Sequence, residues 1–427
     1  MAKSVKQPVE TPPYLKQVRI RDYAPLRDAK VDFKSGLNII IGNNGVGKTK
    51  FLTLLNRLAN IYQDQIDGIG CELTVAGDYN IKVEYKEMQS DNKPKRPGPY
   101  DSEDKEFESR NEVLTKVTYK AETLTKDTIF DAMADLKKGR LFSYEPVLVA
   151  HGIPTTGLPL VEEIADMLLE KRSVTITLKG VEKKLIHQVQ SRFIQSWLRS
   201  VVRVMRNGFT VLNGVAVPAL TAEQAKQLIT RVTDIYVERL NNYLPLYSPI
   251  GAIKRSVGFD IYYNNVQDEY ILKGPVLEYK VGEVWLPFSA LSDGTKRLFY
   301  IIAELISPVV VSVDKQTNDV GIYDGGKVIL LEEPELGIHP DQLHKLLSLI
   351  REVSREHQVI MTTHSPQVLD MLSEKELDRI TICELDPKKG TQFRKLSRAK
   401  QEEARTYMRE QLHLSDFWRY ADLEAKD

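Results

Sequence analysis

Cysteine is nearly absent from this sequence, which has only Cys71 and Cys383 among 427 residues. No disulfide framework and no CxxC metal site can be built from them. Long apolar runs are absent too: the longest, residues 298–313, contains a glutamate, a serine and a proline and is too short to cross a bilayer. The polar first 13 residues lack the apolar core of a signal peptide. We therefore expect a soluble, cytoplasmic protein without a membrane partner.

An excess of charge of either sign is also missing, because 59 Lys and Arg balance 59 Asp and Glu. A neutral chain has no general attraction for nucleic acid, so any DNA contact must come from a local patch. Hydrophobic residues make up 42% of the chain, which is enough to bury a core. The length exceeds one typical domain but suits a large α/β domain with an insertion.

Strand-like and helix-like segments alternate in the first and last thirds of the chain, which predicts an α/β fold. Helices are expected at residues 48–58 and after residue 296. Strands are expected near residues 14–41, 71–85, 114–119, 146–150, 259–263, 270–288, 328–331 and 359–361. Residues 158–244 have a helical character instead. There, 181–206 and a segment opened by a capping box at Thr221 predict an inserted helical hairpin.

A phosphate-binding loop is predicted between the strand ending at Ile41 and the helix beginning at Lys48. The motif GxxxxGK[ST] is complete, with its residues being Gly42, Asn43, Asn44, Gly45, Val46, Gly47, Lys48 and Thr49. Glycines let consecutive N–H groups point at phosphates, and the helix N-terminus adds its dipole. Lys48 is expected to bind the β- and γ-phosphates of ATP, and Thr49 to offer its hydroxyl to Mg²⁺.

Two adjacent carboxylates, Glu332 and Glu333, follow a buried strand at 328–331. Ligands of open α/β sheets bind at the carboxyl ends of strands, so an acidic pair there suits metal binding and catalysis. Glu332 is the candidate Mg²⁺ ligand, and Glu333 the candidate group that orients or deprotonates the attacking water. A solvated acidic turn is the alternative explanation, which the phosphate loop makes less attractive.

Two further segments are weaker signals on their own. Ser292 and Gly294 lie in LSDGT, just before an apolar helix, where a serine and a glycine can bind an anion or simply cap the helix. His364 lies in TTHSP at the end of another apolar strand. That histidine could contact the γ-phosphate or the attacking water, or be purely structural.

The order of these four segments resembles that of ABC-type ATPase heads, in the RecF, SMC and OLD-like branch of AAA ATP-binding proteins. LSDGT is similar to the ABC signature, ILLEEPE to the Walker B strand and TTHSP to the H-loop. The resemblance covers residues 14–156 and 246–400. It implies a head with a mixed-sheet lobe and a helical lobe, divided into 14–156, an inserted subdomain at 157–245, and 246–427.

The resemblance also implies roles for the site residues. Lys48, Glu333 and His364 would be catalytic in the hydrolysis of ATP to ADP and phosphate, and Thr49 and Glu332 would hold Mg²⁺. Ser292 and Gly294 would close over the nucleotide of a second copy. The expected assembly is therefore a homodimer or higher homo-oligomer.

Two departures from the family pattern affect the site. Glu332 stands where Walker B normally has Asp, which changes the expected geometry of Mg²⁺ binding. No Q-loop glutamine is evident; the best candidate region is 146–152, with His151 at its strand end.

Standalone heads of this kind resemble ATPase subunits of bacterial anti-phage systems, in which a separate effector such as a nuclease acts. The residues after His364 lack an acidic nuclease core, and 388–420 are expected to form a basic loop and helix. A RecF-like DNA-repair ATPase is the alternative, and a transporter ATPase is disfavoured by the long insertion. Residues 179–207, with seven Lys or Arg, could contact DNA, a partner protein or only solvent.

Overall fold

A computed structural model describes most of the two halves of the predicted head and only part of the insertion. The described residues are 14–59, 70–76, 81–87, 113–119, 122–124, 150–153, 174–177, 211–212, 215–216, 222–258, 260–264, 269–273, 277–307, 310–313, 320–323, 328–420 and 423. The chain divides into two compact units that alternate along the sequence. The first comprises residues 1–150, 326–330 and 356–427, and the second comprises 151–325 and 331–355.

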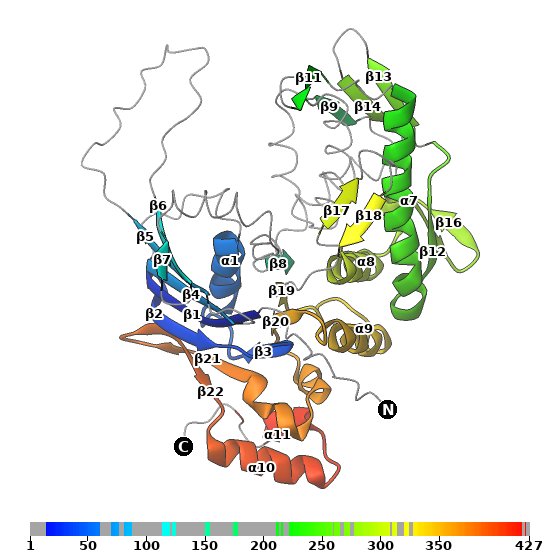
Figure 1. The fold of residues 1–427 in the computed structure, drawn as a ribbon. Helices are drawn as coiled ribbons and strands as arrows, with labels where there is room; N and C mark the ends of the chain where they lie inside the picture. Colours follow the sequence, from blue (N-terminus) through cyan, green and yellow to red (C-terminus); the bar gives the residue numbers. More distant parts are fainter. Residues whose placement is uncertain are drawn as a thin grey trace, which may run out of the picture. The chain divides into compact units, whose positions relative to one another are not determined.

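A mixed β-sheet forms the body of the first unit (Figure 1). Its first strands are β1 (Tyr14–Tyr23), β2 (Leu26–Asp32), β3 (Leu37–Ile41), β4 (Gly70–Ala76), β5 (Ile81–Glu87), β6 (Val113–Tyr119) and β7 (Glu122–Leu124). The later strands are β8 (Ala150–Ile153), β19 (Val328–Glu332), β20 (Gln358–Thr362), β21 (Ile380–Asp386) and β22 (Gly390–Lys395). Of β8, only Ala150 belongs to the first unit. The order of the described strands is β7-β6-β5-β4-β1-β2-β22-β21-β3-β20-β19-β8. β3 is parallel to both β20 and β21, while β1, β2, β4 and β5 form antiparallel pairs, so the predicted mixed α/β sheet is confirmed.

The strand β3 is fully buried and leads to helix α1 (Lys48–Ala59), as predicted from its apolar run (Figure 1). Asn38 is the polar exception, with an exposed fraction of 0%. Its side chain accepts from Lys34 N and donates to the carbonyls of Lys34 and Gly36, which closes the turn that enters β3. Phe51 of α1 is fully buried among apolar strand residues, so α1 is fixed to the sheet by its hydrophobic face.

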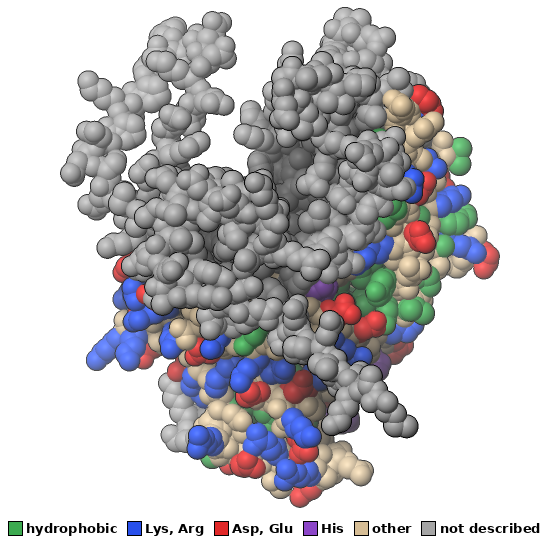
Figure 2. Space-filling view, in the orientation of Figure 1, with side chains coloured by type: hydrophobic (Ala, Val, Ile, Leu, Met, Phe, Trp, Pro, Cys, Tyr) green, Lys and Arg blue, Asp and Glu red, His purple; other side chains and the backbone are tan. Residues whose placement is uncertain are grey.

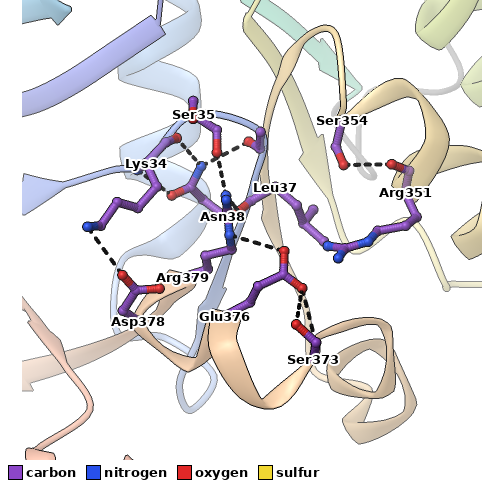
Figure 3. A network of polar contacts seen from close by, with 11 residues as sticks. Lys34, Ser35, Leu37, Asn38, Arg351, Ser354, Ser373, Glu376, Asp378 and Arg379 are labelled. Atoms are coloured by element: carbon purple, nitrogen blue, oxygen red, sulfur yellow. Dashed lines mark hydrogen bonds and ion pairs between the residues drawn. The ribbon is translucent and has the colours of Figure 1, made fainter. Parts of the chain in front are cut away.

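A polar network attaches the segment after β20 to the start of β3 (Figure 3). The segment contains two 3₁₀ helices, η2 (Pro366–Met371) and η3 (Glu374–Arg379). Arg379 donates to the carbonyl of Ser35 and, at 2.9 Å, to that of Leu37. Asp378 forms an ion pair with Lys34 at 3.2 Å. The turn and first residue of β3, the strand before the predicted phosphate loop, are therefore fixed by residues more than 300 positions later in the chain.

The C-terminal part of the first unit confirms a helix within 388–420 but corrects the expectation of a loop before it. Residues 390–395 form β22, which pairs with β21 along its length and with β2 at Gly390. The helices α10 (Arg398–Arg409) and α11 (Leu414–Tyr420) follow. Basic residues of α10 pair with acids, as in Arg405–Glu402 and Arg409–Glu374. Figure 2 accordingly shows Lys, Arg, Asp and Glu side chains interspersed over this end of the face in view, rather than one basic patch.

Three contacting helices, α7 (Ala222–Tyr247), α8 (Asp293–Ile306) and α9 (Pro340–Val353), form the framework of the second unit. A small antiparallel sheet, β12 (Ile250–Arg255), β15 (Leu277–Val281) and β16 (Val284–Leu286), precedes the short helix η1 (Phe288–Ala290). Further short strands are β9 (Val174–Thr177), β10 (Val211–Leu212), β11 (Val215–Ala216), β13 (Asp260–Asn264), β14 (Glu269–Lys273), β17 (Val310–Val313) and β18 (Val320–Tyr323).

Aromatic packing fixes the start of α8. Phe288 and Tyr279 are fully buried, and Phe288 lies 5.7 Å from Phe299 and 5.3 Å from Tyr300, between ring centroids. These tilted and edge-to-face contacts are the arrangements that aromatic quadrupoles favour. The LSDGT segment, which follows η1, is thus attached to a rigid core.

The expected helical character of 158–244 holds only in part. α7 begins next to the predicted capping box and runs to Tyr247, three residues beyond the segment expected to be helical. However, β9, β10 and β11 are strands, which corrects the expectation for those residues. β9 is the β-branched sequence VTIT, and it pairs with β14 almost a hundred residues later. The first helix of the predicted hairpin, 181–206, the basic stretch 179–207 and Thr221 lie outside the described residues, so the hairpin remains a prediction. None of the helices described is long and apolar enough to span a membrane.

Candidate nucleotide-binding site

The predicted phosphate loop joins β3 to α1, with Lys48 as the first helical residue. Gly42, Gly45 and Gly47 adopt positive φ angles of 144°, 79° and 106°. Residues with a β-carbon rarely adopt these conformations, so the three glycines give the loop its curved shape. A curved loop at a helix N-terminus is the arrangement that turns backbone N–H groups toward an anion.

Neighbouring strands press closely on two of these glycines. A β-carbon on Gly42 would lie 2.1 Å from the carbonyl oxygen of Cys383, and one on Gly47 would lie 2.4 Å from Thr391 Oγ1. Thr391 also donates its hydroxyl to the carbonyl of Val46 at 2.6 Å. β21 and β22 therefore support the back of the loop. Sequence reasoning missed Thr391 and Cys383, because only the sheet order brings them next to the loop.

Lys48 is held at the loop itself. Its side chain is only 5% exposed, and Nζ donates to the carbonyls of Gly42 at 2.7 Å and Asn43 at 2.8 Å. Asn43, Gly45 and Thr49 are exposed. An ammonium group fixed by loop carbonyls, beside exposed backbone and a hydroxyl, fits the phosphates of a nucleotide and its Mg²⁺ ion.

The TTHSP segment ends the strand next to β3. β20 runs parallel to β3, with Thr362 opposite Ile40, and Thr363 N donates to the carbonyl of Ile40 at 3.2 Å. Neighbouring parallel strands end at the same edge of the sheet. His364, which is exposed, and Gly42, which is buried, therefore follow the ends of β20 and β3 at that edge. Ser365 N donates to Thr363 Oγ1 at 2.9 Å, which fixes the turn around His364.

The acidic pair lies at the end of β19, the strand that is next to β20 in the sheet order. β19 starts in the first unit, and its last two residues belong to the second. Glu332 is 8% exposed, whereas Glu333 is partly buried and has a left-handed φ of 42°. A left-handed glutamate is uncommon, and such strain concentrates at functional sites.

The LSDGT segment caps α8 in the second unit. Ser292 is the exposed N-cap residue, and its Oγ accepts from Thr295 N at 3.3 Å. A β-carbon on Gly294 would lie 2.9 Å from the carbonyl oxygen of Gly337, in the loop that follows the acidic pair. Gly294 therefore permits a close approach between the LSDGT segment and the loop that contains Gly337. Ser292 also has the ordinary role of capping helix α8.

Arg297 is a residue that sequence reasoning missed at this site. It follows LSDGT on α8, is buried, and donates from Nη2 to the carbonyl of Glu333 at 2.8 Å. The available signal in the sequence was an arginine directly before the largely apolar helix run LFYIIAELI.

The proposed Q-loop region contains β8, which includes His151. The strand begins at Ala150 rather than at residue 146, and residues 146–149 lie outside the described part. The side chains of β8 are likewise outside the description, so a role for His151 remains a prediction.

The predicted site residues thus fall in both units. The first unit brings together Gly42 to Thr49 and the strand that carries His364, and the second brings Ser292 and Gly294 close to the loop after Glu333. A mixed sheet with a glycine loop between a buried strand and a helix defines the class of P-loop nucleotide-binding proteins.

Comparisons with known families agree with this class. A model described as "AAA ATPase domain" matches residues 14–151. A second, described as "AAA domain, putative AbiEii toxin, Type IV TA system", matches residues 258–370. The two segments correspond to the two halves of the predicted head. The predicted resemblance to AAA-type ATP-binding proteins is therefore confirmed, and with it the class of a nucleotide-binding protein.

Two relatives have names that indicate a biological setting. The chain is 33% identical over 103 residues to the Septu protein PtuA of Bacillus thuringiensis, a match that covers 24% of this chain and 25% of that protein. It is 22% identical over 403 residues to the "Retron Ec83 probable ATPase" of Escherichia coli, covering 84% of this chain and 70% of that protein. The first match thus spans a quarter of the relative's length and the second more than two thirds.

Among solved structures, the chain is similar to SMC heads. An SmcHead bound to the C-winged helix domain of ScpA aligns with 12% identity and a TM-score of 0.47, over 91% of this chain and 99% of that one. The SMC head domain from Thermotoga maritima aligns with 11% identity and a TM-score of 0.41, over 90% and 99%.

Proposed function

We propose that the protein is an ATPase head that dimerises around ATP and thereby regulates a separate effector in bacterial anti-phage defence. The observation that carries the nucleotide part is the phosphate loop, with its three positive-φ glycines and the buried Lys48 at the start of α1. The defence setting rests on the relatives named for the Septu and retron systems.

The reaction is the hydrolysis of ATP to ADP and phosphate. Lys48 and the loop N–H groups bind the phosphates, and His364 contacts the γ-phosphate or the attacking water. Glu333 orients that water and accepts its proton as the oxygen attacks phosphorus. Thr49 and Glu332 would hold Mg²⁺, which neutralises charge on the phosphates when bound.

A second copy completes each site in this proposal. Ser292 is exposed at the N-terminus of α8, where its hydroxyl and the helix dipole are suited to an anion. Contacts between LSDGT and the other copy's γ-phosphate would exist only in the closed dimer, so ATP would favour closure and hydrolysis would release it. The effector, for example a nuclease, would respond to that change.

The test uses Glu333→Gln, which keeps the shape of the site but removes the base. Its mass in solution is measured by light scattering with Mg-ATP and without nucleotide, beside Lys48→Ala. Glu356→Gln, the same chemical change at an exposed residue, is the matched control. We expect Glu333→Gln to gain mass only with ATP and to lose hydrolysis. Lys48→Ala should lose hydrolysis without gaining mass, and Glu356→Gln should behave as wild type.

Each other outcome has a defined meaning. If Glu333→Gln stays monomeric with ATP, head-to-head closure is wrong. If its mass is high and unchanged by ATP, assembly depends on other surfaces. ATP-dependent retention of DNA, with affinity falling as salt rises, would favour the RecF-like alternative.

A further inference from the structure

Within the second unit, the helix that follows LSDGT is tied to the loop that follows the acidic pair. Arg297 Nη2 donates to the carbonyl oxygen of Glu333 at 2.8 Å. Gly337 lies two residues before His339, the N-cap of α9, and it closely approaches Gly294. A β-carbon added to Gly294 would lie 2.9 Å from the carbonyl oxygen of Gly337. The two segments therefore meet at both ends of the loop 333–337.

Glu333, which accepts the hydrogen bond from Arg297, has an unusual backbone conformation. Glu333 has a φ of 42°, and the other described non-glycine residues with positive φ are Asp22 and Gln411. A left-handed conformation is unfavourable for an ordinary L-residue and persists only where its surroundings hold it. The Glu333 carbonyl accepts two hydrogen bonds, from Arg297 and from Leu336 N at 3.1 Å. Of these donors, only Arg297 comes from outside the loop.

The burial of Arg297 is hard to explain by packing alone. Residues 298–303 and 305–306 of α8 are buried and apolar, yet a guanidinium with an exposed fraction of 8% precedes them. Burial lowers the pKa of Arg297, and the charges of Glu335, Glu333 and Glu332 oppose that effect. A charged group is costly to bury, so a guanidinium that is kept here and donates to the carbonyl of left-handed Glu333 has a role beyond packing.

We propose that Arg297 is a positioning residue, which fixes the backbone of Glu333 in its left-handed conformation and so sets the direction of the Glu333 carboxylate. The inference rests on the proposed function for its catalytic consequence, because Glu333 is the base there. Its structural part, the fixed loop, stands on the hydrogen bond and the φ angle.

The test compares Arg297→Met, which keeps the length of the side chain without a donor, with Arg297→Lys, which restores one donor and the charge. Arg239→Met is the matched control. Arg239 lies in the same unit and also donates to a main-chain carbonyl, that of Ile306, which lies outside the acidic loop. Hydrogen exchange is followed by mass spectrometry on a peptide covering 331–338, together with kcat, the Kd of a fluorescent ATP analogue and Tm.

We expect Arg297→Met to exchange the 331–338 peptide about tenfold faster and to lower kcat about 10- to 100-fold, the scale of a small misplacement of a catalytic group. Its Kd for the ATP analogue should stay within about threefold of wild type, and Arg297→Lys should recover part of both losses. Arg239→Met should lower Tm without selectively changing the loop or kcat.

Unchanged exchange of the 331–338 peptide in Arg297→Met would overturn the proposal, and so would equal losses of kcat in Arg297→Met and Arg239→Met. If both Arg297 variants fail to fold while Arg239→Met folds, Arg297 is a structural residue and the proposal is wrong. A wild-type protein without ATPase activity would instead refute the proposed function. The exchange measurement would still decide whether Arg297 fixes the loop.

Discussion

The glycines of the phosphate loop allow a prediction that separates two physical effects. Gly42→Ala adds a β-carbon at a φ of 144° and places it 2.1 Å from the carbonyl oxygen of Cys383. Gly45→Ala adds the same atom at a φ of 79°, with no other atom within 4 Å. Both substitutions therefore carry a backbone cost, but only Gly42→Ala adds steric overlap with a neighbouring strand.

The expected magnitudes follow from these geometries. A positive φ at alanine costs about 1–2 kcal/mol, which should be the whole effect of Gly45→Ala. Overlap with a backbone atom cannot be relieved by turning a side chain, and forced shifts in a packed core add about 1–3 kcal/mol. Gly42→Ala should therefore lose about 2–5 kcal/mol, and β21 should move away from the loop.

The assay is urea unfolding of the wild type and both variants, with the free energy of unfolding obtained from midpoints at a common slope. The relevant quantity is the difference between Gly42→Ala and Gly45→Ala, because only Gly42→Ala adds overlap with a backbone atom. Equal losses for the two variants would refute the reasoning, since they would mean that the approach of Cys383 does not constrain Gly42.

Three further predictions concern stability. Burial lowers the pKa of Lys395 in the folded protein to about 8, whereas its pKa in the unfolded chain is near 10.5. Between these two pH values the unfolded chain binds more protons than the folded protein. The contribution of Lys395 to the free energy of unfolding therefore rises with pH in this window. Relative to Lys395→Met, the wild type should gain about 3 kcal/mol across that window, measured by urea unfolding at each pH. Arg379→Met removes donors from the carbonyls of Ser35 and Leu37 and should cost about 3 kcal/mol by the same method. Phe288→Ala should cost about 3–5 kcal/mol and lower Tm, because the ring is fully buried among three other aromatic rings.

An exposed lysine, an exposed arginine and an exposed tyrosine, the last in place of a phenylalanine, provide the controls for these three variants. Lys388→Met, Arg398→Met and Tyr420→Ala should each change stability by about 0.5 kcal/mol or less. A pH-independent difference between wild type and Lys395→Met would contradict the assigned burial effect. Losses no larger than those of the controls would contradict the roles of Arg379 and Phe288.

Local sequence was sufficient to predict a helix or strand where its hydrophobic pattern matches the burial of that element in the structure. The buried run before Gly42, the complete phosphate motif and the apolar strands before Glu332 and Thr363 predicted β3, α1, β19 and β20 correctly. These elements are specified by short-range chemistry: glycines that permit positive φ, and apolar residues that suit central strands covered on both faces. The resemblance to AAA-type ATP-binding proteins rested on the same motifs.

Prediction failed where distant partners decide the structure. Residues 390–395 look polar and basic, yet β21 and β2 supply their hydrogen bonds. VTIT at 174–177 lies in a segment with helical character and becomes a strand by pairing with β14. β-propensity depends on such neighbours, which a local window cannot contain.

The sequence by itself determined the chemistry that this protein carries: the phosphate loop, the acidic pair, the LSDGT serine and the TTHSP histidine, in the order of an ATPase head. Only the tertiary structure decided how those groups are held. It placed Thr391 behind Gly47, fixed β3 through Arg379, and set the carbonyl of Glu333 against Arg297. The physical reason is that a motif encodes local backbone conformation and side-chain type, whereas the supporting contacts join residues up to several hundred positions apart.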